Sequence, residues 1–274
     1  MLPCSRKRMR SSFSFSDMAA VRAVWAENFA VESALFHAVA PLAAYAAINV
    51  QYPGCVVTAP RYYDLTTAEQ RYQVVRANAD QLEPLQLGIA IRTSDGRTFA
   101  WEFNLNGFDL AAAANNTCNP SSIAYLRRRG IDFNALPWSG VSTASLRSLL
   151  LSSGLLLARP FWATFAGAYH VAYFAKLLLG TNLPDDLATF EETVGGLGAL
   201  LGPNVYDVRV LASEHRGPLL HVARRLGVAV QEYAEAGLAG AGSLMALQAF
   251  LALTDQRGGA AMHHRGVLAG LQAI

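Results

Sequence analysis

The sequence predicts a single α/β domain in which helices cover the faces of a mixed β-sheet. The strongest observation is a hairpin, because residues 85–91 and 98–104 alternate apolar and polar side chains on either side of the turn Ser94-Asp95-Gly96. Helical and short strand-like segments then alternate along the chain, which is typical of a sheet with helices on its faces. No linker rich in proline, serine or charge follows Met18, so one domain over 17–274 is expected.

Composition excludes several classes of protein. Of the 274 residues, 53% are hydrophobic and 15% are charged, which is ample for a core and too apolar for a disordered chain. The net charge of +2 does not by itself indicate a surface that binds nucleic acids. The longest apolar run, 149–158, is too short and too interrupted to cross a bilayer, so no membrane partner is expected. Cys4, Cys55 and Cys118 lack metal-site spacing and fit a reduced intracellular compartment.

The first residues predict a disordered basic tail over 1–16. This stretch has no apolar signal core and carries the cluster Arg6-Lys7-Arg8-Met9-Arg10. A nuclear-localisation signal and a solvated tail are both compatible with it.

The elements that precede the hairpin are predicted from caps and breakers. A helix should begin at Ser16-Asp17, a favourable N-cap pair, and run to Phe29, and a second helix should cover 31–40. The apolar run 45–48 predicts a buried strand that ends at Pro53-Gly54, because proline cannot donate to a sheet ladder.

The later elements follow from helical periodicity and from turn residues. Thr67 opens a helix that runs to Asp80, and Pro120-Ser121-Ser122 opens another that Gly130 ends. Apolar patterning predicts the remaining helices over 142–152, 169–179, 185–194, 219–226 and 243–253, and short strands over 161–165 and 204–208.

Two amides at the end of the first strand are the most informative pair. Asn49 and Gln51 are two residues apart, so their side chains should project from the same face of the strand. If both were acids, the stretch would read Asp-x-Glu-Tyr-Pro-Gly, the first metal-binding motif of a two-metal exonuclease. As written, the side chains are neutral near-isosteres of those carboxylates.

Further segments extend this motif in a fixed order along the chain. They are Val24-Trp25-Ala26-Glu27-Asn28, Gln51-Tyr52-Pro53-Gly54, 72–80, Leu85-Gln86-Leu87-Gly88, Trp101-Glu102-Phe103-Asn104, 126–133, 150–154, Asn182-Leu183-Pro184 and Val205-Tyr206-Asp207-Val208. Together they resemble the Caf/Pop-type deadenylases of the CCR-NOT complex, exonucleases of the Asp-Glu-Asp-Asp class. The resemblance covers about residues 20–270.

The resemblance implies a ribonuclease-H-like fold and a poly(A)-specific 3′-5′ exoribonuclease activity. In that family four acids hold two Mg²⁺ or Mn²⁺ ions, which stabilise the attacking and leaving oxygens. Matched onto this chain, the four acid positions are occupied by Asn49, Gln51, His170 and Gly242, and the family base position is occupied by Gly237.

These five departures predict a pseudonuclease that binds no catalytic metal pair. Two unit charges 4 Å apart interact by roughly 4 kcal/mol at an effective dielectric constant of 20. If each of the four positions loses even half of this interaction energy, too little remains to hold Mg²⁺. No cofactor is therefore expected. Neutral replacements should also relieve the mutual repulsion of clustered acids, which predicts a fold that persists without metal.

Three functional hypotheses follow. The first is a catalytically inactive subunit in mRNA poly(A)-tail shortening that docks the NOT scaffold and the second deadenylase of the complex, in nucleus and cytoplasm. The second is an active 3′-5′ poly(A) exoribonuclease that uses displaced ligands. The third is a non-catalytic module that binds poly(A) RNA and protects tails.

Other polar residues are weaker candidates. Asp207 is expected to have a structural hydrogen-bonding role, and the glycines of 196–202 lack the spacing of a dinucleotide loop. Arg127-Arg128-Arg129 can contact phosphate or simply complement the helix dipole, and 61–63 can stack on RNA or pack as an ordinary loop. Four histidines form no metal spacing, and they are His215, His221, His263 and His264.

Overall fold

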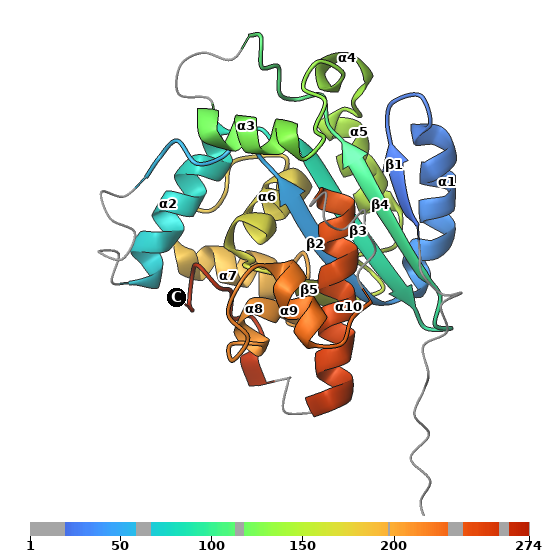
Figure 1. Ribbon diagram of the computed structural model, residues 1–274, viewed down its shortest axis with the longest axis vertical. Coiled ribbons are helices and arrows are strands. Elements are labelled where there is room, and N and C mark those ends of the chain that lie inside the picture. Colours follow the sequence, from blue (N-terminus) through green and yellow to red (C-terminus); the bar gives the residue numbers. More distant parts are fainter. Residues whose placement is uncertain are drawn as a thin grey trace, which may run out of the picture.

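The computed structural model describes residues 20–58, 67–112, 118–196, 198–229, 238–257 and 263–273. It confirms the mixed α/β fold, with a six-stranded sheet in the order β1-β4-β3-β2-β5-β6 between two layers of helices (Figure 1). The strands are β1 (Val21–Val24), β2 (Ala43–Gln51), β3 (Gln86–Thr93), β4 (Thr98–Asn104), β5 (Phe161–Thr164) and β6 (Val205–Asp207).

Ten α-helices and a short 3-10 helix (Ala40–Leu42) occur in the described residues. The α-helices are α1 (Phe29–Val39), α2 (Ala68–Gln81), α3 (Pro120–Arg128), α4 (Leu136–Ser139), α5 (Thr143–Ser152), α6 (Ala168–Leu179), α7 (Leu187–Gly195), α8 (Val208–Leu211), α9 (Leu219–Arg225) and α10 (Ala239–Arg257).

Strand β2 lies in the middle of the sheet and sets the register of its neighbours. It pairs antiparallel with β3 and parallel with β5, and β3 pairs antiparallel with β4 as the hairpin pattern predicted. Asn49 lies opposite Gly88, and Gly88 lies opposite Glu102. Directly opposite residues of a sheet share a face, so these three positions form one row.

Helix α10 crosses one face of the sheet, and α6 packs on the other (Figure 1). Helices α8 and α9 accompany α10, and α2 and α5 pack against α6. Beneath α10 the register aligns one alanine from each of four strands, and this row is Ala100, Ala90, Ala47 and Ala163. All four are buried with the apolar side chains of α10, so small side chains let this helix lie close to the strands.

The helix predicted from Ser16-Asp17 to Phe29 is wrong over Val21–Val24. These residues form β1, which pairs parallel with the edge of β4, while the proposed cap lies outside the described residues. An ion pair between Arg22 and Glu32, with Arg22 Nε 2.6 Å from a carboxylate oxygen, ties the strand to α1. Pairing with β4 therefore overrides the local helical pattern.

Some predictions concern residues whose structure is not described. The basic tail over 1–16 and the segment Arg61-Tyr62-Tyr63 both lie outside the described ranges. Within those ranges, no helix combines the length and the apolar character that crossing a membrane requires.

Candidate functional site

Three of the predicted site residues meet at the C-terminal end of β2. Asn49 and Gln51 project from the same face of the strand, and their amide groups are hydrogen-bonded over 3.2 Å. His170, in the first turn of α6, brings its Nε2 within 3.3 Å of the Asn49 amide nitrogen. The structure thus brings Asn49, Gln51 and His170 together, although they are up to 121 residues apart in the chain.

The hydrogen bonds determine the protonation of His170. The backbone N–H of Val50 donates to Nδ1 over 3.0 Å, so Nδ1 holds a lone pair and the proton of the neutral ring is on Nε2. Nε2 then needs an acceptor, and the Asn49 carbonyl oxygen provides one when its amide is turned over. Turning over the amides of Asn49 and Gln51 keeps the atom positions and satisfies both the contact between the two amides and the contact between Asn49 and Nε2.

Burial lowers the pKa of His170 to about 4, although a hydrogen bond with the backbone of Phe165 opposes the shift. Desolvation disfavours the charged imidazolium more than this bond favours it. His170 is therefore neutral at pH 7. The site consists of one neutral imidazole and two neutral amides, joined in a continuous hydrogen-bonded chain.

Gly242 packs directly against this chain from α10. A Cβ atom at Gly242 would lie 2.8 Å from Asn49 Cγ and 3.0 Å from both polar atoms of the Asn49 amide. Contacts this short require the helix or the asparagine to move. Position 242 is therefore a close-packing point between α10 and β2. Gly237, the predicted base position, lies outside the described residues.

The N-terminus of α10 approaches the sheet equally closely at two further glycines. A Cβ at Gly88 would overlap the Ala239 carbonyl oxygen at 1.8 Å, and one at Gly240 would lie 2.8 Å from Glu102 Cβ. The absence of side chains at Gly88, Gly240 and Gly242 is what permits this packing.

Glu102 is a buried carboxylate beside the site that the sequence analysis did not single out. Its Oε2 accepts from the backbone N–H of Gly240 over 2.9 Å, and its Oε1 accepts from Gln86 over 3.3 Å. Burial raises its pKa, while those two hydrogen bonds favour the ionised form. The alternation of Ala100, Glu102 and Asn104 on one face could have revealed it, because it places an acid on the inward side of β4.

Glu102 caps the start of α10. The first N–H groups of a helix lack intrahelical acceptors and carry partial positive charge. One oxygen of Glu102 accepts from the Gly240 N–H and the other accepts from the Gln86 amide, so each carboxylate oxygen has a hydrogen-bond donor.

The donor set at the end of β2 does not fit a Mg²⁺ pair. Mg²⁺ favours hard oxygen ligands and is usually held by carboxylates, whereas this group offers two carboxamides and a neutral imidazole. Across the ranges that the structure describes, no cluster of three or more His, Cys, Asp or Glu side chains could hold a metal ion.

Asp207 has the structural role that the sequence suggested. Its carboxylate accepts from the backbone N–H groups of Ala166, Gly167, Arg209 and Ala269 over 2.7–3.0 Å. Burial raises the pKa of Asp207, and these four donors oppose the rise. The residue joins β6, the start of α6 and the C-terminal segment.

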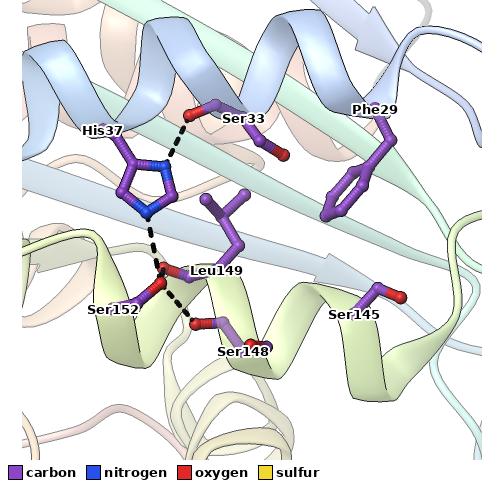
Figure 2. A pocket seen from close by; sticks show the side chains of 7 residues that line it. All are labelled: Phe29, Ser33, His37, Ser145, Ser148, Leu149 and Ser152. Carbon is purple, nitrogen blue, oxygen red and sulfur yellow. Dashed lines mark hydrogen bonds between the residues drawn. The ribbon is translucent and has the colours of Figure 1, made fainter.

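A groove between α1 and α5 is a separate surface feature (Figure 2). It has a volume of about 310 Å³ and is lined by Phe29, Ser33, His37, Ser145, Ser148, Leu149 and Ser152. His37 spans it, with Nδ1 donating to the Ser33 carbonyl over 2.8 Å and Nε2 lying 3.2 Å from Ser152 Oγ (Figure 2).

Comparison with known proteins indicates a family. Residues 24–147 match the model of the CAF1 family ribonucleases. The chain is 31% identical over 211 residues to probable CCR4-associated factor 1 homolog 7 of Arabidopsis thaliana, an alignment that covers 73% of this chain and 74% of the relative. It is 28% identical over 217 residues to poly(A) ribonuclease pop2 of Schizosaccharomyces pombe, covering 74% of this chain and 62% of that protein.

Solved structures show the same fold. The Mg²⁺- and Mn²⁺-bound form of S. pombe Pop2p superposes with a TM-score of 0.76 at 25% identity, covering 92% of this chain and 99% of the other. A chain from the structure of the yeast NOT1 MIF4G domain co-crystallised with CAF1 superposes with a TM-score of 0.70 at 23% identity, covering 91% and 96%. From the family match and the Arabidopsis relative together, we conclude that the chain belongs to the CAF1 family of ribonucleases.

Proposed function

We propose that this CAF1-family chain is a non-cleaving subunit of a CCR4-NOT deadenylase assembly. The observation that carries the proposal is the neutral chain formed by Val50 N–H, His170, Asn49 and Gln51. Its members satisfy one another, so no cation is required to hold them in place. Clustered carboxylates would instead repel one another until metal ions bound between them.

Steric packing at α10 supports the same conclusion. An acid at position 242 would have to displace Asn49 or lift the helix, because even a Cβ lies 2.8 Å from Asn49 Cγ. The charges that would attract Mg²⁺ and the space for a fourth acid are therefore both missing. The alternative, an active 3′-5′ poly(A) exoribonuclease, would need ligands from other residues.

A deadenylation assay tests the proposal. The substrate is a 5′-labelled RNA that ends in an oligo(A) tail, incubated with purified protein in Mg²⁺, in Mn²⁺ and in EDTA. The S. pombe Pop2 relative serves as the positive control. We expect the native chain to leave the tail intact and its melting temperature to be unchanged by millimolar Mg²⁺ relative to a salt control of equal ionic strength.

The contrary result is equally clear. Tail shortening that requires Mg²⁺ or Mn²⁺ and that co-purifies with the native chain would overturn the proposal. The variant Asn49→Asp/Gln51→Glu/His170→Asp then asks whether charge alone is missing. We expect metal ions to raise the melting temperature of this variant, because it has three new carboxylates. We expect no activity, because position 242 still lacks the fourth acid.

We further propose that the partner is a NOT-type scaffold that docks on the groove between α1 and α5. An exposed apolar side chain stands next to this groove in the chain: Leu151 on α5, adjacent to the groove-lining Ser152, is 45% exposed. Exposed apolar groups around a groove are typical of protein interaction sites. The NOT1 MIF4G structure with CAF1 supports this class of partner, and contact with a second deadenylase and a location in nucleus and cytoplasm remain predictions.

A further inference from the structure

We propose that Cys55 is a site of reversible oxidation, at which a hydroperoxide converts the thiol to a sulfenic acid. The residue lies in the loop that follows β2, and its side chain interacts with the hydroxyl groups of three tyrosines, which are Tyr52, Tyr169 and Tyr173. The inference does not depend on the proposed function, because none of these four residues occupies the position of a family acid or base.

The three tyrosine rings pack face to face beside the thiol. The ring centroid of Tyr52 lies 5.1 Å from that of Tyr169 and 5.0 Å from that of Tyr173. Tyr169 and Tyr173 both belong to α6 and are four residues apart, so they stand on the same face of the helix. The stacked rings therefore fix three hydroxyl groups relative to the end of β2.

Two of these hydroxyl groups, those of Tyr52 and Tyr169, donate hydrogen bonds to the sulfur of Cys55. Burial raises the pKa of both phenols, and the interaction with Cys55 raises it further. Both hydroxyls therefore keep their protons at pH 7. Donors of this kind stabilise negative charge on sulfur, and the thiolate is the form of cysteine that attacks an oxidant.

The third hydroxyl group, that of Tyr173, lacks an acceptor. The residue is 2% exposed, and its hydroxyl has no hydrogen-bond partner within the ranges that the structure describes. A buried hydroxyl without a partner is unfavourable. The group interacts electrostatically with Tyr52 and Cys55, so it faces the same cluster. A sulfenic acid would place a new oxygen on the sulfur of Cys55, and that oxygen is the acceptor that Tyr173 lacks.

The backbone around Cys55 is held from two sides. The side-chain oxygen of Asn78 on α2 accepts from the backbone N–H groups of Val56 and Val57 over 2.8 and 2.9 Å. The side-chain amide of Asn119, the N-cap of α3, donates to the Cys55 carbonyl over 3.3 Å. The thiol therefore keeps its place beside the tyrosines. Because Cys55 is only half-buried, a small oxidant can reach it.

The proposed reaction balances with hydrogen peroxide as the oxidant. The sulfur attacks one peroxide oxygen, so that an S–O bond forms and the O–O bond breaks. The sulfur loses two electrons, and the departing oxygen gains them and takes up the proton of the thiol. The products are the sulfenic acid and water. A thiol reductant returns the sulfenic acid to the thiol, which makes the modification reversible.

Cys118 provides a matched comparison within the same chain. It is also a free, half-buried cysteine, but it packs against the apolar cluster that contains Ile123 and Leu126. The experiment treats the reduced full chain with hydrogen peroxide, traps sulfenic acid with a dimedone probe and measures each cysteine separately by peptide mass spectrometry. We expect Cys55 to be labelled about tenfold faster than Cys118 or more, and dithiothreitol added before the probe to abolish the labelling.

Phenylalanine variants test the two donors, because they keep the rings and remove only the hydroxyl groups. A hydrogen bond to a charged group changes an equilibrium by about tenfold or more. Stabilising a thiolate also makes it less nucleophilic, with a Brønsted coefficient of about 0.5, so about half of the logarithmic effect remains in the rate. Tyr52→Phe and Tyr169→Phe should therefore each slow the labelling of Cys55 by about threefold or more. Tyr45→Phe, at the other end of β2, is the control and should react as the native chain does.

Tyr173→Phe tests the third hydroxyl group. The variant should not destabilise the reduced chain, because the hydroxyl has no partner among the described residues. Its oxidised chain should lose more in melting temperature, relative to its reduced chain, than the native protein does. The proposal is overturned if Cys55 and Cys118 are labelled at equal rates, or if Tyr52→Phe and Tyr169→Phe react as Tyr45→Phe does. An oxidation-dependent change in melting temperature that is the same in Tyr173→Phe and the native chain would also overturn it.

Discussion

His170 places a titratable group among neutral ones, and this makes stability depend on pH. Its pKa is about 4 in the folded chain against an ordinary value near 6.5 in the unfolded chain. Protonation therefore favours unfolding, and the stabilisation present above pH 6.5 is lost as the pH falls towards 4. Each unit of difference between the folded and unfolded pKa is worth 1.36 kcal/mol, so the loss of stability is at most about 3 kcal/mol. Partial exposure of His170 to solvent makes the true loss smaller.

Urea denaturation at pH 7, 5.5 and 4 measures this effect. We expect the free energy of unfolding of the native chain to fall over this interval, and His170→Gln to reduce the fall. The glutamine keeps a polar group between Val50 and Asn49 but cannot take up a proton. Identical pH slopes for the two proteins would show that His170 is not the group responsible.

Gly242 offers a direct test of the close approach of α10. Gly242→Ala should destabilise the chain by about 1 kcal/mol, because overpacking typically costs about 1–3 kcal/mol and alanine recovers about 1 kcal/mol through helix propensity. In an Asn49→Ala background the three atoms that a Cβ would meet are gone. The same substitution should then be neutral or stabilising, and a double-mutant cycle of unfolding free energies measures the difference.

At the residue scale, the sequence predicted which side chains lie together but not how they interact. Spacing alone placed Asn49 and Gln51 on one face of β2, and the resemblance added His170 and Gly242. Sequence carried no signal that the Val50 N–H would fix the tautomer of His170, because that bond joins residues 120 apart. The crowding at Gly242 was equally hidden, since it depends on the distance between a helix and a strand.

At the element scale, α10 depends on Glu102 for the start of its helix. Glu102→Ala should leave the Gly240 N–H without its acceptor and the Gln86 amide with Asn104 alone, and an unpaired buried N–H costs about 1–3 kcal/mol. Glu102→Gln keeps an acceptor oxygen and should cost less. Amide hydrogen exchange should speed up first at the N-terminal turn of α10, whereas equal acceleration along the whole helix would contradict a capping role.

Long elements were predictable and short ones were not. Helices such as α2 and α6 carry several turns of periodic pattern, and the β3–β4 hairpin carries its own turn signal. Helices α4 and α8 have four residues each, too few for a period to be recognised. Strand β1, also of four residues, exists because β4 offers a free edge, and a local pattern does not record that partner.

At the scale of the whole molecule, the groove between α1 and α5 should determine assembly. A pull-down with a purified NOT1 MIF4G domain should capture the native chain, and Leu151→Arg should reduce capture strongly, because a charge would replace an exposed apolar side chain next to the groove-lining Ser152. Arg225→Glu, a charge change at an exposed residue of α9, serves as a control on a different helix. Capture that is unaffected by Leu151→Arg would place the partner on another face.

The row of Ala100, Ala90, Ala47 and Ala163 has a consequence for anyone who redesigns this protein. Small side chains line the contact between α10 and the sheet, and a Cβ atom added at Gly88, Gly240 or Gly242 would meet the opposite element at 1.8–2.8 Å. A larger side chain at any of these three positions would require α10 to move away from the sheet. Any redesign of the site at the end of β2 must therefore change the position of α10 as well as the side chains.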